Sequence, residues 1–193
     1  VQLNKHGAQF ALDGVFDAAM ADAVRSFQSE HGLPATGTVD TATWRALVST
    51  SSIDYSLPVA RDTLPRSEYD DPHHDYPAID LPVAEGTPVL AIRGGEATPV
   101  NDSSCGYGVV IQATDGGRYS YCHFRQPALV SGAVTTGQHI GYSGNTGNST
   151  GPHLHVGIRR NGVSVCPQPL LLAIYDGVTP PSIAELPTSG CTY

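Results

Sequence analysis

The feature that most constrains this chain is a glycine-rich loop, Gly144–Pro152, which leads directly into a His-Leu-His triplet at positions 153–155. Apolar residues alternate after it, at 156 and 158, and this pattern predicts a β-strand. Residues two apart on a strand point to the same face, so His153 and His155 should project side by side into one site. Two imidazoles on one strand face suit a divalent metal, with one as a ligand and the other beside the metal-bound water.

Two upstream segments offer the remaining groups that such a site needs. Pro72–Val83 contains adjacent histidines, His73 and His74, and a carboxylate, Asp80, between two apolar residues. A carboxylate in apolar surroundings needs a partner to offset its desolvation, and a metal ion is a strong one. The second segment is Tyr121-Cys122-His123, a tyrosine and a histidine two positions apart.

Taken in order, these segments resemble the lysostaphin/LytM-type zinc endopeptidases, which cut peptide bonds in bacterial peptidoglycan. The family pattern is a His followed shortly by an Asp, a Tyr-x-His segment, a loop with Gly-Asn-Thr-Gly, and a final His-x-His. All four pieces occur here between roughly residues 57 and 175. The resemblance implies a secreted zinc metallo-endopeptidase that hydrolyses peptide bonds in peptidoglycan with a metal-activated water, in cell-wall lysis or remodelling.

The resemblance also implies the ligands of the zinc ion, which are His74, Asp80 and His155. Two histidines and one carboxylate leave the fourth tetrahedral position for water, as in a catalytic zinc site. The commonest family pattern places the first His and the Asp four positions apart, whereas His74 and Asp80 are six apart. The insert Tyr76–Ala78 must therefore bulge, and His73 competes with His74, which we favour, as the first ligand.

His123 and His153 match the two family histidines that do not bind the metal. A neutral imidazole beside the metal can accept a proton from water, and a protonated one can donate to the oxyanion or the leaving amine. The sequence leaves open which histidine has which role.

The N-terminal part of the chain is predicted to be helical. Asp17 can cap a helix with an apolar stripe at Met20, Ala23, Val24 and Phe27, and Gly32 can end it. Asp40 can cap a second helix that carries Trp44, Leu47 and Val48. These segments resemble the small three-helix peptidoglycan-binding module, of whose first helix only the stub Val1–His6 is present.

We therefore expect two domains, a small all-α three-helix module followed by a mainly antiparallel β catalytic domain. The predicted bounds are 1–49 for the module, 50–56 for a linker and 57–193 for the endopeptidase domain. Within the latter, strands are expected near residues 87–92, 108–113, 118–123 and 138–142, with a hairpin turn at Asp115–Gly117.

Composition limits the partners and the compartment. A net charge of −8 argues against nucleic acid as a partner, and no run of 18 apolar residues predicts insertion into a membrane. The polar opening, Val1–Lys5, does not read as a signal peptide, so we expect a mature or trimmed form. We expect a monomer that acts outside the cell or at the cell wall, with peptidoglycan stems or cross-bridges as its partner.

The four cysteines favour disulfides, and hence export, because none shows the close Cys-x-x-Cys spacing usual for a four-thiolate zinc site. Of the three possible pairings we favour Cys105–Cys122 with Cys166–Cys191. Two other functions stay open: a non-catalytic cell-wall scaffold or activator, and a broad secreted metalloprotease.

Overall fold

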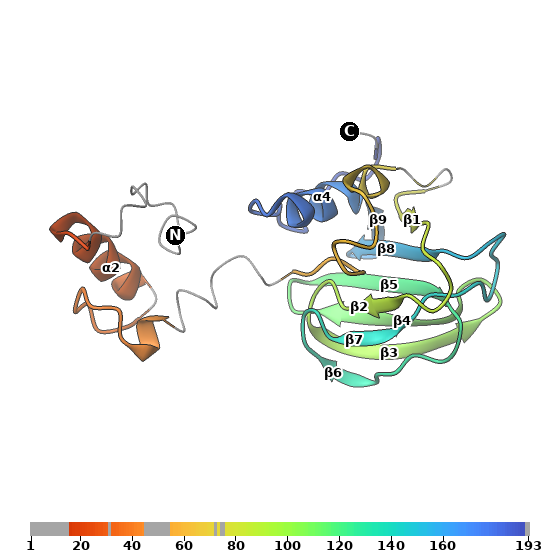
Figure 1. The fold of residues 1–193 in the computed structure, drawn as a ribbon, viewed down its shortest axis with the longest axis horizontal. Coiled ribbons are helices and arrows are strands. Elements are labelled where there is room, and N and C mark those ends of the chain that lie inside the picture. The colour runs from red at the N-terminus through yellow and green to blue at the C-terminus, as the bar shows by residue number, and fades with distance from the viewer. Residues whose placement is uncertain (1–15, 31, 45–54, 72, 74–75, 192–193) are drawn as a thin grey trace. The chain divides into compact units, whose positions relative to one another are not determined.

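The computed structural model describes residues 16–30, 32–44, 55–71, 73 and 76–191. The chain divides into two compact units, Val1–Asp54 and Tyr55–Tyr193 (Figure 1). Most of the expected linker lies outside the described residues. Its last two residues, Tyr55 and Ser56, bond within the second unit, because the Tyr55 hydroxyl donates to Asp115 and the Ser56 amide to Ile92.

The described part of the first unit is helical, as expected. Helix α2, Ala18–Glu30, follows Asp17, whose carboxylate accepts a hydrogen bond from the Met20 amide at 2.8 Å. Gly32 follows with a positive φ of 67°, the left-handed geometry that commonly ends a helix. Val24 and Phe27 of the predicted stripe are buried.

A second helical turn, residues 41–44, starts after Asp40, whose carboxylate accepts from the Thr43 amide at 2.7 Å. Buried Gln28 ties it to α2, because its side-chain nitrogen donates to Thr43 and its oxygen accepts from Gly37. Trp44 is exposed, and the stub Val1–His6, Leu47 and Val48 lie outside the described residues.

The second unit is built on an antiparallel seven-stranded sheet with the order β1-β8-β5-β4-β3-β6, in which β9 also pairs with β8 (Figure 1). The strands run β1 Ile79–Leu81, β3 Gly95–Asp102, β4 Gly106–Ala113, β5 Gly117–Phe124, β6 Gly132–Val134, β8 Leu154–Arg160 and β9 Val163–Val165. Burial largely alternates along β4 and β5, whose buried residues form the inner face of the sheet, whereas the first five residues of β8 are all buried.

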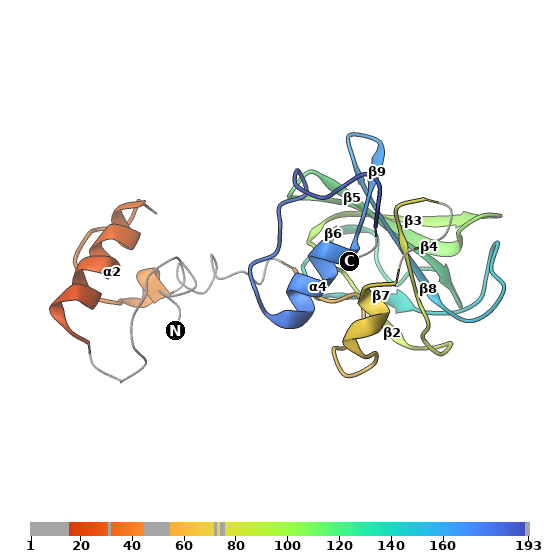
Figure 2. The same ribbon diagram turned by 90° about the horizontal axis from the view of Figure 1, so that it is seen from above.

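A two-stranded sheet, β2 (Pro88–Leu90) with β7 (His139–Tyr142), and the helix α4 (Gln168–Asp176) contribute to the same core. A short 3-10 helix, η1 (Arg66–Tyr69), lies beside α4 and is joined to it by the Arg66–Asp176 ion pair (Figure 2). The outer faces of β5 and β8 are left free of these layers, and this surface carries the candidate site.

All four expected strands are present, and the Asp115–Gly117 turn joins β4 to β5. The sequence did not predict β3 or α4, nor the short strands β6 and β9. β3 contains a proline, Pro99, which is tolerated because β6 pairs only with residues 95–97, so that the strand is an edge at that point. α4 has a continuous apolar run, Leu170–Ala173, without helical alternation because that whole segment is buried.

The two disulfides have the expected pairing, Cys105–Cys122 and Cys166–Cys191. The first joins the turn before β4 to β5, next to His123. The second ties the C-terminal segment to the end of β9. Such bonds persist in oxidising compartments, which places the folded chain outside the cytoplasm. Within the described ranges, no helix has the length and apolar character needed to cross a bilayer.

Candidate metal centre and active site

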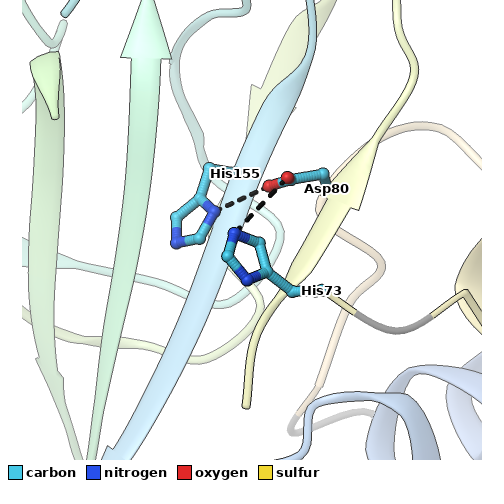
Figure 3. Close-up of side chains that lie close together, drawn as sticks. All are labelled: His73, Asp80 and His155. Carbon is cyan, nitrogen blue, oxygen red and sulfur yellow. Dashed lines mark hydrogen bonds and ion pairs between the residues drawn. The ribbon is translucent and has the colours of Figure 1, made fainter. Parts of the chain in front are cut away.

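Two histidines and one aspartate meet at the outer edge of the large sheet. Asp80 lies on β1 directly opposite His155 on β8, and His73 lies in the segment before β1 (Figure 3). The Asp80 carboxylate is 2.7 Å from His155 Nδ1 and 3.6 Å from His73 Nε2. One ligand atom from each residue lies within 4.8 Å of the other two.

His73, the described histidine of the adjacent pair, lies beside Asp80. The expected first ligand, His74, lies outside the described residues, so the cluster is defined without it. His73 and Asp80 are seven positions apart, and the chain between them closes through a hydrogen bond from the His73 amide to the Ala78 carbonyl. The side chain of Gln168 supports the same segment, donating to the carbonyls of Asp71 and Ala78.

The imidazoles hold Asp80 in its charged form. Burial by itself would raise the pKa of this carboxyl, but the hydrogen bond from His155 and the nearby imidazoles of His155, His153 and His73 bring the pKa below its ordinary value. Asp80 is thus a charged carboxylate facing several nitrogen donors, a set that suits a divalent cation.

His123 reaches this site through an irregularity in β5. The register of β4 and β5 shifts between Tyr107 and Val109, and His123 has a positive φ of 66°. A β-bulge of this kind inserts an extra residue, and here it interrupts the strict alternation of faces. The His123 ring lies 4.6 Å from the ring of His153 and 5.9 Å from that of His155.

Gly108 makes room for this bulge. A Cβ atom at position 108 would lie 2.3 Å from the Tyr121 carbonyl oxygen and 2.6 Å from the sulfur of Cys105. The His123 amide donates to the Cys105 carbonyl at 2.8 Å, next to the disulfide that joins Cys105 to Cys122. A glycine inside a strand pattern is a signal for a bulge, and it was available in the sequence.

Backbone carbonyls select the tautomers of His123 and His153. His123 Nδ1 lies 2.8 Å from the Thr146 carbonyl oxygen, and His153 Nδ1 lies 2.8 Å from that of Gly151. A carbonyl only accepts, so each Nδ1 carries a proton and each neutral ring has its lone pair on Nε2. Burial, together with the neighbouring histidines, lowers the pKa of His123, although its hydrogen bond to Thr146 acts in the opposite direction. The lowered pKa favours the neutral form of the ring.

The glycine-rich loop therefore acts through its backbone. The carbonyls of Thr146 and Gly151 orient the imidazoles of His123 and His153. Outside this loop, Tyr76, for which the sequence suggested no role in the site, places its hydroxyl 3.2 Å from His155 Nε2. The cluster opens into a groove of about 580 Å³ across the outer face of β5 and β8.

The residues present fit zinc. Two imidazole nitrogens and a carboxylate oxygen are its usual protein ligands, and two histidines with one acid leave a position open for a reactant. The side chains of His73 and His155 are each only 10% exposed, so both offer their nitrogen from a partly desolvated surface. The second nitrogen of His155 meets the Tyr76 hydroxyl, the kind of outer partner that orients a metal-binding imidazole.

Comparison with known proteins agrees with this geometry. The sequence model described as Peptidase family M23 matches residues 74–167, and a putative peptidoglycan binding domain matches residues 1–47. The chain belongs to peptidase family M23. Zinc is the metal typical of this family, and His73, Asp80 and His155 form a His/Asp cluster of the kind that it binds.

Individual relatives match the same region. The DD-carboxypeptidase/endopeptidase Mpg of Neisseria meningitidis is 39% identical over 94 residues, or 48% of this chain and 22% of the relative. The lysostaphin catalytic domain from Staphylococcus simulans is 33% identical, with 49% of this chain and 77% of that one covered, at a TM-score of 0.43.

A zinc-containing peptidase from Vibrio cholerae has a TM-score of 0.50 at 23% identity, over 58% of this chain and 38% of that one, which shows a shared fold. The chain spans about a fifth of the length of the first curated relatives that it matches.

Proposed function

We propose that this chain is a zinc endopeptidase that hydrolyses peptide bonds in bacterial peptidoglycan. The observation that carries the proposal is the His73–Asp80–His155 cluster with two further imidazoles, His123 and His153, beside it at one end of an open groove. Membership of family M23 and the match to a peptidoglycan-binding domain support both the reaction and the substrate.

We propose His73, Asp80 and His155 as the zinc ligands. The sequence favoured His74 over His73; the cluster in which one ligand atom each from His73, Asp80 and His155 lies within 4.8 Å of the others supports His73. Bound zinc supplies a Lewis acid that polarises a peptide carbonyl and lowers the pKa of water.

His123 and His153 serve as proton carriers. Each has its Nδ1 committed to a backbone carbonyl, so Nε2 is the atom that exchanges protons with the reactants. One ring accepts the proton of the attacking water, and the other, when protonated, donates to the oxyanion or to the leaving amine. His153 Nε2 lies 3.7 Å from the Asp80 carboxylate, which puts this nitrogen beside the metal cluster.

The N-terminal unit binds the polymer and keeps the peptidase close to it. The expected domain bounds, 1–49, 50–56 and 57–193, are part of this proposal, as is a monomeric state, which sedimentation equilibrium would measure. The two disulfides and the wall substrate agree with a secreted protein that acts outside the cell or attached to the wall.

Metal removal tests the reaction. One zinc per chain should be found by elemental analysis, and lysis of purified walls should cease with a chelator and return with zinc. His155→Ala should lose both metal and activity, whereas His123→Ala and His153→Ala should keep most of the zinc and lose activity. His139→Ala is the matched control, because its ring bonds to Gly141 on β7.

Two comparisons separate the alternatives. His73→Ala and His74→Ala, measured side by side for zinc content, identify the first ligand. A chain without metal whose effect on walls survives chelation would be a scaffold or activator, and equal digestion of casein and walls would indicate a broad protease. Mass spectrometry of the released fragments then defines the bond that is cut.

A further inference from the structure

The groove ends, away from the metal cluster, in two arginines that face each other across neighbouring strands. The register of β5 and β8 pairs Cys122 with His155, then Ser120 with Gly157, and finally Arg118 with Arg159. Both arginines line the groove and are exposed. Like charges placed directly opposite on adjacent strands destabilise a sheet, so the fold gains nothing from this pair.

Neither guanidinium is used elsewhere in the described part of the chain. The other described arginines each contact a carboxylate, a carbonyl or an aromatic ring; they are Arg25, Arg61, Arg66, Arg93, Arg125 and Arg160. No such partner is found among the described residues for Arg118 or Arg159. Two unneutralised cations in a chain of net charge −8 form a local site for an anion.

Only small side chains line the surface of β5 and β8 between the arginines and the metal cluster. Only Ser120 and Gly157 separate the two ends along the paired strands, and a Cβ atom at Gly157 would already lie 2.8 Å from the Ser120 hydroxyl. Asp102, another carboxylate that lines the groove, is committed to the amides of Ser104 and Cys105. An extended chain can therefore lie flat from one end to the other.

We infer that Arg118 and Arg159 bind a carboxylate of the substrate peptide, about four residues from the bond that is cut. Position 159 is four residues beyond His155, roughly 13 Å along a strand, which an extended peptide also spans with about four residues. Two guanidiniums can hold a carboxylate through paired hydrogen bonds. This inference rests on the proposed peptidase function and adds to it a preference for acidic peptides.

The test uses soluble peptides built around the candidate bonds of peptidoglycan, in the stem and in the cross-bridge. Each pair has Glu or Gln at the fourth residue, on the N-terminal side in one pair and on the C-terminal side in the other. For the wild-type protein, one Glu peptide should exceed its Gln partner in kcat/KM by about tenfold or more. Arg118→Gln/Arg159→Gln should abolish that ratio, whereas Arg25→Gln/Arg66→Gln, with the same loss of charge outside the groove, should keep it.

Binding of the same peptides to the zinc-loaded protein, measured by calorimetry, provides a readout without turnover. Tighter binding of a Glu peptide that depends on both arginines supports the inference even if no peptide is cut, an outcome that would count against the peptidase function alone. Cleavage and binding of Glu and Gln peptides with equal efficiency in both pairs would overturn the inference and leave the peptidase function standing. A ratio that survives the double substitution would overturn it as well.

Discussion

Replacing Gln168 with leucine should weaken zinc binding, although residue 168 touches no metal ligand side chain. Gln168 is fully buried at the start of α4, and its side-chain nitrogen donates to the carbonyls of Asp71 at 3.2 Å and Ala78 at 2.9 Å. These two bonds fasten both ends of the segment that carries His73. Leucine has a similar size and removes both bonds without opening a large cavity.

The structure sets the magnitude. Two neutral hydrogen bonds contribute about 1 kcal/mol each, so Gln168→Leu should lower the free energy of unfolding by about 2 kcal/mol. The loss should be partly offset, because the Gln168 side-chain oxygen has no partner among the described residues and its removal relieves a buried polar group. If the whole 2 kcal/mol were needed to reorder the segment on binding, zinc affinity would fall by at most about thirtyfold.

Two measurements separate these effects. Urea unfolding of the metal-free protein gives the stability, and competition with a chromophoric chelator gives the zinc affinity. Gln138→Leu is the matched control, because its side chain bonds only to Thr135 among the described residues, away from the site. A Gln168→Leu protein that is less stable but binds zinc as tightly as wild type would refute the reasoning and show that the position of His73 does not depend on α4.

Three other predictions concern the bulge, a buried hydroxyl and the N-terminal unit. Gly108→Ala should distort the β5 bulge at His123, because the added Cβ would lie 2.3 Å from the Tyr121 carbonyl oxygen. We expect activity to fall by about tenfold or more with zinc content retained. Unchanged activity would contradict this role of the bulge. Tyr69→Phe should leave the melting temperature unchanged or raise it, because the Tyr69 hydroxyl is buried without a partner among the described residues, and a clear drop would reveal one. Removing residues 1–52 should reduce activity on whole walls more than on a short soluble peptide, because the N-terminal unit raises the local concentration of the enzyme; equal losses on both substrates would mean that it completes the groove.

The sequence by itself determined much of this protein, because those features depend on near neighbours in the chain. The alternation around His155 predicted its strand, and the apolar flanks of Asp80 marked it as a carboxylate in need of a partner; the two meet across β1 and β8. The hairpin at Asp115–Gly117 followed from local turn chemistry, since Gly116 has a positive φ and the Asp115 carboxylate accepts from the Gly117 amide. The favoured cysteine pairs were also correct.

Only the tertiary structure decided how the remaining groups come together. His123 joins the site through a bulge that needs Gly108, the Cys105 carbonyl and the Thr146 carbonyl, three groups from separate segments. The arginine pair likewise exists only because the register of β5 against β8 sets residue 118 opposite residue 159. Contacts of this kind depend on how strands far apart in the chain align, and strand alignment is settled by the packing of the whole core rather than by the residues next to each site.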